Sequence, residues 1–226
     1  MGAVTLSKAN RLFWLGRYLE RVYTGIKATK TIFDAETDGG EGDYAAYCRA
    51  LGLPNDYENT ADFIRRYYFD PTNPNSLISA LGCAYDNAVV LRETLTSDTL
   101  AYVQMAVSAM ELAARSAGPG VELQWVLDDI MAFRGSCEEK MPDESGRDII
   151  KTGSSLERVD LYLRLGVEPE VCEKEFTRLF NRLYKSRLET DKEKMDLLVD
   201  AILDKTTPTP PLATLVGTLE TLFPAM

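Results

Sequence analysis

An adjacent glutamate and arginine occur twice in this chain, each time within the same short pattern. Residues 16–22 (GRYLERV) are matched 137 positions later by residues 153–159 (GSSLERV). A guanidinium group binds carboxylates and phosphates through paired hydrogen bonds, and a carboxylate can act as a general acid or base. The repeat therefore marks a candidate site for binding or acid–base chemistry. It also indicates a duplicated architecture.

Further polar side chains share the helix face of each Glu-Arg pair, because they lie three or four residues away. In the first copy the candidate residues are Trp14, Arg17, Glu20 and Arg21, and in the second they are Glu157, Arg158, Asp160 and Arg164. Three interpretations are open. The pairs are weak, solvated ion pairs; they form a partly buried, reciprocal network that fixes helix register; or they hold an anion. We predict that the two Glu-Arg helices pack directly against each other.

A third group of polar residues lies on a predicted helix over 75–94. We expect Asn75 and Ser76 to cap the start of this helix, since both types favour that position. Asn87 lies in mid-helix, where asparagine is a mediocre helix former, so it remains a candidate for a binding role. Arg92 and Glu93 repeat the theme of an adjacent arginine and glutamate.

The residue types exclude several kinds of site. The chain has no histidine, which removes His-ligated metals and the usual general base. Its four cysteines are widely spaced and predict buried thiols, not a disulfide scaffold or a structural zinc. An acidic stretch from Asp34 to Gly39 resembles the start of a calcium loop, but Ala45 stands where a bidentate glutamate is needed. We expect no metal and no cofactor.

Composition bounds the class of protein. The 226 residues are 45% apolar, enough for a sizeable core, and carry a formal net charge of −10. An acidic balance argues against general nucleic-acid binding. No apolar run approaches the roughly 18 residues of a membrane span, and the N-terminus lacks the pattern of a signal peptide. We therefore expect a soluble, cytoplasmic protein that binds neither nucleic acid nor membranes.

Apolar residues recur at helical spacing along nearly the whole chain, and no segment alternates as a strand would. The fold class is predicted as all-α, an elaborated helical bundle of roughly nine helices with the two Glu-Arg helices at its centre. The predicted helices cover residues 7–33, 43–51, 60–69, 75–94, 97–116, 121–141, 144–166, 169–189 and 191–204. Residues 1–205 are expected to form one helical domain. Residues 206–226 are expected to supply a Pro-rich linker and a short helix over 212–223, packed on that domain.

Three segments resemble the bacterial alpha-E family, helical proteins named for a repeated Glu-Arg motif. Leu6-Ser7 and residues 12–21 (LFWLGRYLER) are similar to the opening of the family. Residues 69–77 (FDPTNPNSL), followed by 86–88 (DNA) and 91–95 (LRETL), are similar to its loop-to-helix junction. Residues 153–164 are similar to its second Glu-Arg helix, although Ser154 stands where an arginine is expected.

The resemblance implies a context. Genes of the family accompany circularly permuted ATP-grasp amide ligases and transglutaminase-like proteins, which suggests the synthesis or attachment of a small peptide. The function expected from this resemblance is a non-catalytic helical partner of an ATP-grasp ligase, whose Glu-Arg core shapes a pocket or a docking face. A small carboxylate or a peptide is the expected ligand.

Two alternatives stay open at this point. The chain is an enzyme of the same pathway, with Glu20 or Glu157 as acid/base and Arg21 or Arg158 holding a carboxylate, or it is a pure scaffold. The solvent exposure of the Glu-Arg pairs discriminates among these functions, because pairs sealed between helices favour a scaffold.

Overall fold

The computed structural model describes residues 5–204 and 210–224, and within them every regular element is a helix. The all-α prediction is therefore confirmed, with eleven helices in place of the roughly nine expected. They are α1 (Leu6–Ala28), α2 (Lys30–Thr37), α3 (Tyr44–Leu51), α4 (Thr60–Phe69), α5 (Leu77–Val90), α6 (Ser97–Ala113), α7 (Gly120–Lys140), α8 (Glu144–Arg164), α9 (Pro169–Ser186), α10 (Lys192–Ile202) and α11 (Leu212–Glu220).

The largest error in the predicted helices lies near the N-terminus. The single helix predicted over 7–33 is wrong, because α1 ends at Ala28 and α2 begins at Lys30. Between them, the Thr29 hydroxyl donates a hydrogen bond of 2.7 Å to the Gly25 carbonyl and lies 2.5 Å from the Tyr68 hydroxyl. A threonine that bonds the preceding turn in this way bends a helix. The break therefore lies where the Thr29 hydroxyl bonds the preceding turn and also contacts Tyr68.

Other helix ends follow their capping chemistry. Ser76 begins α5 as predicted, since its hydroxyl accepts a hydrogen bond from the Ser79 amide. The α4 helix is capped by Asn59, whose side chain accepts a hydrogen bond from the Asp62 amide. The helix predicted over 75–94 ends early, at Val90, and a turn follows.

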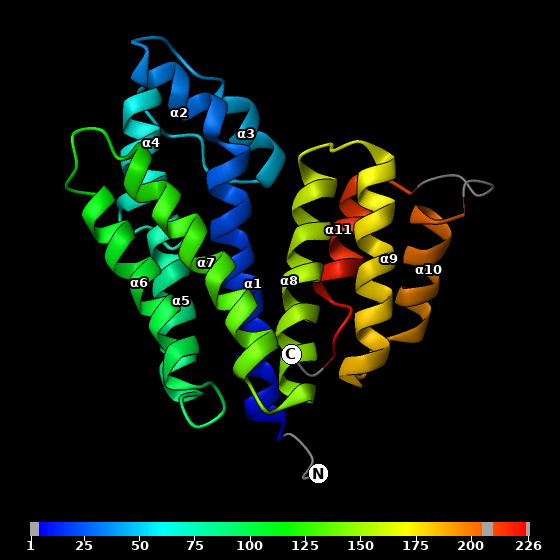
Figure 1. The fold of residues 1–226 in the computed structure, drawn as a ribbon. Coiled ribbons are helices and arrows are strands. Elements are labelled where there is room, and N and C mark those ends of the chain that lie inside the picture. Colours follow the sequence, from blue (N-terminus) through cyan, green and yellow to red (C-terminus); the bar gives the residue numbers. More distant parts are fainter. Residues whose placement is uncertain (1–4, 205–209, 225–226) are drawn as a thin grey trace. The chain divides into compact units, whose positions relative to one another are not determined.

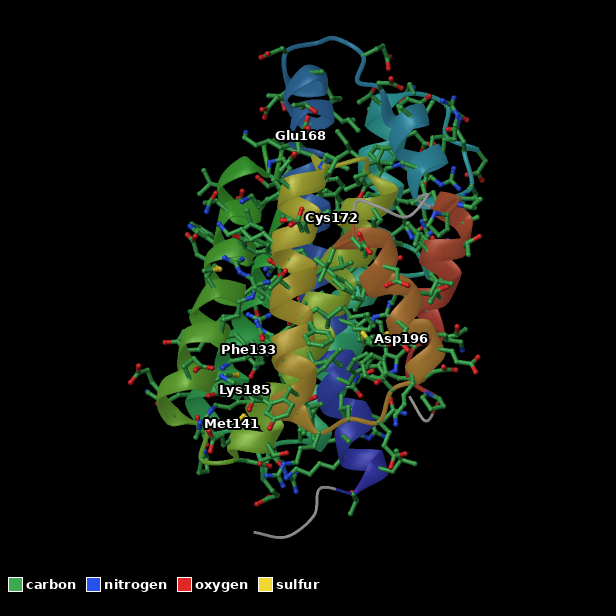
Figure 2. The ribbon with its side chains drawn as sticks, turned by 90° about the vertical axis from the view of Figure 1, so that its right-hand side faces the viewer. Phe133, Met141, Glu168, Cys172, Lys185 and Asp196 are labelled. Carbon is green, nitrogen blue, oxygen red and sulfur yellow. The ribbon has the colours of Figure 1, made fainter. Side chains whose placement is uncertain are left out.

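The chain divides into two compact units, and α1 contributes to both. The first unit holds the N-terminal part of α1, up to Arg17, and the chain from Glu144 onward, whereas the second unit is Tyr18–Asp143. In the first unit α8 packs along α9, and α11 packs against α8 and α10 (Figure 1). Figure 2 shows α9 running from near Glu168, past Cys172, to Lys185. Of the expected Pro-rich linker, residues 206–209 lie outside the described residues.

The second unit is built on a helical hairpin of α6 and α7, against which α5 packs along α6. The α4 helix contacts α2 and α5 and supplies an aromatic cluster to the core. Phe63 stacks on Tyr67 and on Tyr44, and the hydroxyls of Tyr47 and Tyr67 are 2.8 Å apart. The polar ends of these buried rings are thus paired with each other. This cluster stabilises the unit.

No helix within the described ranges combines the length and the apolar character that crossing a bilayer requires.

Candidate functional site

The two copies of the repeat meet within the first unit at a pair of glycines. A Cβ built on Gly16 would lie 2.1 Å from the Ile150 carbonyl oxygen, and one built on Gly153 would lie 2.1 Å from the Phe13 carbonyl oxygen. Residues 13 and 150 are themselves equivalent in the repeat, so the contact is reciprocal. The prediction that the two Glu-Arg helices pack together is confirmed where α1 and α8 cross. Only glycine allows backbones to approach this closely.

Directly beside this crossing, Arg17 and Glu157 form an ion pair. The Arg17 Nε donates to the Glu157 Oε2 over 2.7 Å, with the two side chains 9% and 1% exposed. The Arg17 guanidinium also lies over the Trp14 ring, 4.6 Å from its centre. Three predicted site residues are thus brought together. Because both charges are shielded from water, removing either one takes away a counter-charge that the other cannot replace with solvent.

On the next turn of α8, Asp160 and Arg164 form a second pair. The Arg164 Nε lies 3.0 and 3.1 Å from the two Asp160 carboxylate oxygens, and its Nη2 lies 2.7 Å from the exposed Glu220 of α11. Burial raises the pKa of Asp160 above its ordinary value, while the charge of Arg164 opposes the rise. The contact between Arg164 and Glu220 joins α8 to α11.

The arginine of the second motif faces α9. Arg158 Nη1 lies 3.1 Å from the Oε1 of buried Glu175, which also accepts a hydrogen bond from the Ser155 hydroxyl. Arg178 binds the other oxygen of Glu175 at 2.9 Å, and Arg182 donates to the Ser155 hydroxyl. We call these five residues the Glu175 cluster. It brings three guanidinium groups and the Glu175 carboxylate together between α8 and α9.

In the second unit, Glu20 is fully buried and pairs with α7. Its Oε2 accepts from Arg134 Nη2 at 2.7 Å, and its Oε1 accepts from the Thr24 hydroxyl at 2.8 Å. The Arg134 guanidinium also lies over the Tyr23 ring, 4.5 Å from its centre. Glu20 therefore has a cation and a hydroxyl as partners inside its own unit. The pair ties α1 to α7.

Arg21, the arginine of the first motif, is not fully buried. Arg21 is half-buried, with its guanidinium 5.9 Å from the centre of the Tyr18 ring. Burial raises the pKa of Tyr67 above its ordinary value, and the positive charge of Arg21 opposes that rise. Arg21 thus acts electrostatically on the aromatic cluster of the second unit.

The third polar group separates into a cap and an exposed turn. The Asn75 amide donates to the Asn73 side chain, and the Ser76 hydroxyl donates to the Asp70 carbonyl as well as capping α5. Asn87 is half-buried on α5. Arg92 and Glu93 lie after α5 and form a largely exposed pair 3.4 Å apart. These two are therefore not part of a buried Glu-Arg arrangement.

Sequence reasoning missed the residues that complete the buried pairs, above all Arg134 and Glu175. Glu175 does leave a signal, because it occupies the apolar stripe of α9 beside Cys172, Phe176 and Leu179. A charged residue within a core stripe needs a buried partner. Arg134 follows the buried Phe133 at the edge of the α7 stripe and gives a weaker signal.

Acid–base chemistry and metal binding find little support in these clusters. A general acid or base must reach a substrate proton, whereas Glu20 and Glu157 are enclosed and already bound by guanidinium groups. Across residues 5–204 and 210–224, no three carboxylate or cysteine side chains gather where a metal ion would fit. The arrangement is suited to holding helices in register, and the Glu175 cluster is also suited to binding an anion.

Comparison with known proteins gives one match. The Alpha-E family model, described as a predicted alpha-helical domain with a conserved ER motif, matches residues 6–203. Both Glu20-Arg21 and Glu157-Arg158 lie inside the matched range. Neither curated proteins nor solved structures gave a match.

Proposed function

The chain belongs to the Alpha-E family, and from this premise we propose that it is a non-catalytic helical partner of an ATP-grasp amide ligase. In this function the Glu-Arg motifs hold the helices in register, and a surface of the protein docks the ligase. The ligase as partner follows from the context that the family resemblance implies. The proposal starts from two findings, the all-helical fold and membership of the family.

One observation carries the non-catalytic part of the proposal. The Glu20 and Glu157 side chains are 0% and 1% exposed, and each already binds an arginine from another helix. Catalysis by either carboxylate would require these helices to separate, which breaks its ion pair with Arg17 or Arg134. The same burial supports a role in fixing the shape of the protein. A protein that functions by binding a partner does not need these helices to separate.

The test is capture of the partner. A tagged copy of the chain is expressed in its native cells, captured at low salt, and analysed by mass spectrometry for proteins and small molecules. The proposal expects an ATP-grasp ligase to be enriched over a capture with an unrelated acidic helical protein. Capture without any ligase, or a purified chain that by itself turns over a carboxylate substrate, would contradict it.

The Glu175 cluster favours a second candidate function, the binding of a small carboxylate or of a peptide's C-terminus. Its three guanidinium groups belong to Arg158, Arg178 and Arg182, of which Arg158 and Arg178 bind the two oxygens of Glu175. Arg178 is half-exposed, so a ligand can reach it. Calorimetric titration with succinate tests this candidate. Binding by the wild type that is lost in Arg178→Gln but kept in Arg115→Gln, an exposed control, would support it.

A further inference from the structure

We propose, resting on the proposed function, that the groove between α6 and α7 binds a short amphipathic helix of the partner. This helix carries lysine or arginine beside its apolar stripe. The groove lies within the second unit and has a volume of about 560 Å³. None of the Glu-Arg residues lines it.

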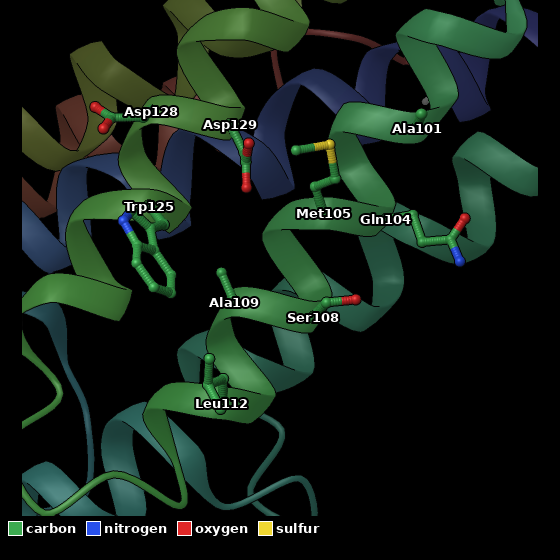
Figure 3. A pocket seen from close by; sticks show the side chains of 9 residues that line it. All are labelled: Ala101, Gln104, Met105, Ser108, Ala109, Leu112, Trp125, Asp128 and Asp129. Carbon is green, nitrogen blue, oxygen red and sulfur yellow. The ribbon is translucent and has the colours of Figure 1, made fainter.

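The shape of the groove fits a helix of about three turns. Its α6 wall consists of residues that repeat at helical spacing: Ala101, Gln104, Met105, Ser108, Ala109 and Leu112. Eleven residue steps along a helix correspond to roughly 16 Å. Trp125, Asp128 and Asp129 of α7 form the other wall, and Figure 3 shows Trp125 and Asp129 across the hollow from α6. A helix laid along such a groove buries one apolar face.

The groove exposes apolar side chains that the core does not use. Met105, Leu112 and Trp125 are 50%, 48% and 47% exposed. The core face of α6 is supplied by other residues, such as Val103 and Met110, which are buried. Large apolar side chains that gather on a surface mark interaction sites. Methionine adapts to different partners, and tryptophan is a frequent anchor of binding energy.

The charge of the groove selects the partner. Asp128 and Asp129 are its only ionisable lining residues, so its charge is negative. Asp128 accepts a hydrogen bond of 2.8 Å from Gln124, and Asp129 is partly buried. Burial and the charge of Asp128 raise the pKa of Asp129, which means that a nearby cation would be favourable. The Trp125 ring adds a face for cation–π contact.

The same charge disfavours a second copy of this chain. Two identical grooves placed face to face would oppose their aspartates, and like charges across an interface cost free energy. An apolar helix bearing lysine or arginine instead gives each aspartate an opposite charge. The occupant that fits is therefore a cation-bearing amphipathic helix.

Two synthetic peptides test the proposal. One is a labelled helix of leucine and lysine at helical spacing, and the other has glutamate in place of lysine. Fluorescence anisotropy with the full chain measures their dissociation constants at low and high salt. We expect the lysine peptide to bind and the glutamate peptide to bind at least about tenfold more weakly. Equal binding of both peptides would overturn the proposal.

Matched variants locate the binding. Met105→Gln/Leu112→Gln is expected to weaken the lysine peptide about tenfold or more, because apolar anchors dominate such interfaces. Its control is Val171→Gln/Phe180→Gln, which removes two similarly exposed apolar side chains from α9. Circular dichroism confirms that each variant folds. Unchanged binding by the groove variant, or an equal loss in the control, would show that the peptide binds elsewhere.

A second pair of variants isolates the charge. Asp128→Asn/Asp129→Asn is expected to weaken binding about three- to tenfold at low salt and less at high salt. Glu168→Gln/Glu170→Gln changes net charge by the same amount at an exposed site on the first unit and should leave binding unchanged. An equal loss in both would mean that only the net charge of the protein attracts the peptide, and the proposal would be wrong. Self-association that the groove variant relieves would likewise overturn it, in favour of a second copy.

Repeating the ligase capture with Met105→Gln/Leu112→Gln separates this inference from the proposed function. Loss of the ligase with the groove variant alone supports both. If wild type and variant capture the ligase equally, the docking surface lies elsewhere, and the inference is wrong while the function stands. If the wild type captures no ligase, the proposed function is wrong, whereas the peptide measurements still decide the chemistry of the groove.

Discussion

Glu20 and Glu157 are equivalent in the repeat, and both are buried, yet they are neutralised in different ways inside their units. Glu157 pairs with Arg17 of the other copy, and the glycine crossing lies next to this pair. Glu20 pairs with Arg134 of α7, which lies outside both copies. The Arg134 side chain is also more exposed than that of Arg17, 27% against 9%. Inside the units, each of the two buried carboxylates thus binds a guanidinium, that of Arg17 for Glu157 and that of Arg134 for Glu20.

The position equivalent to Arg17 explains part of this difference. In the second copy it is Ser154, whose hydroxyl lies 3.1 Å from the Gly16 carbonyl oxygen and donates to it. A serine here supports the close approach of α8 to α1, while the arginine at the matching position supplies charge. The same position therefore supports close helix packing in the second copy and supplies a charge in the first.

The largest expected effect comes from the crossing itself. Gly153→Ala puts a Cβ against the Phe13 carbonyl, which cannot move without displacing the helix. We expect the free energy of unfolding to fall by about 3 kcal/mol or more. Urea unfolding followed by circular dichroism measures it. Gly135→Ala in α7, where an added Cβ meets nothing within 4 Å, is the control and should stabilise by about 0.5–1 kcal/mol. If both variants changed the free energy of unfolding equally, the close approach at the glycine crossing would not be a source of stability.

The next effect sharpens the contrast between the two carboxylates. Arg17→Ala leaves Glu157 buried without the guanidinium that it binds, and such a change costs about 3–5 kcal/mol. The double variant Arg17→Ala/Glu157→Gln should recover part of the loss, because a buried neutral amide needs less compensation than a buried carboxylate. Urea midpoints of the single and double variants provide the measurement. A double variant that is less stable than the single one would contradict an uncompensated charge as the cause.

A smaller loss is expected on the Glu20 side. Arg134 is more exposed than Arg17, so water can reach the space that Arg134→Ala opens, and Thr24 still donates to Glu20. We expect a cost of about 1–3 kcal/mol. Arg92→Ala is the control, since its pair with Glu93 is solvated, and it should change stability by less than about 0.5 kcal/mol. A loss at Arg134 as large as that at Arg17 would erase the difference between the two units.

The smallest effect is a change with pH. Because burial raises the pKa of Asp160, the neutral carboxyl is favoured in the folded state. Its contribution to stability is therefore fully present below the ordinary pKa near 3.8 and falls as the pH rises through the raised pKa. Asp160→Asn cannot titrate, so its stability relative to the wild type should improve from acidic to neutral pH. Urea unfolding across this range tests the sign, and an opposite trend would mean that Arg164 outweighs burial.

Helix positions followed from local pattern, whereas the partners of the buried charges did not. Apolar residues at helical spacing predicted a helix over 7–33, and those that fall in α1 are buried: Leu12, Leu15, Leu19, Val22 and Ile26. The break at Thr29 was missed, because apolar periodicity does not show the hydroxyl's bond to the preceding turn or its contact with Tyr68, 39 residues away. Arg134 and Glu175 were missed for the same reason, as their pairing requires the packing of whole helices. In the sequence, the exposed groove shows only as more apolar residues than the buried stripe of a helix needs.

The division of α1 between the two units also has a consequence for synthesis. All residues of the second unit, Tyr18–Asp143, have been translated before α8 exists, so this unit can complete its fold while the ribosome is still working. The first unit combines the N-terminal segment that ends at Arg17 with the chain from Glu144 onward. It therefore cannot fold until that later part has been translated. Closing so long a loop costs entropy, but a folded intervening unit shortens the loop that remains open. The acquisition of protection from hydrogen exchange by α8 and α9 should therefore follow that of α6 and α7.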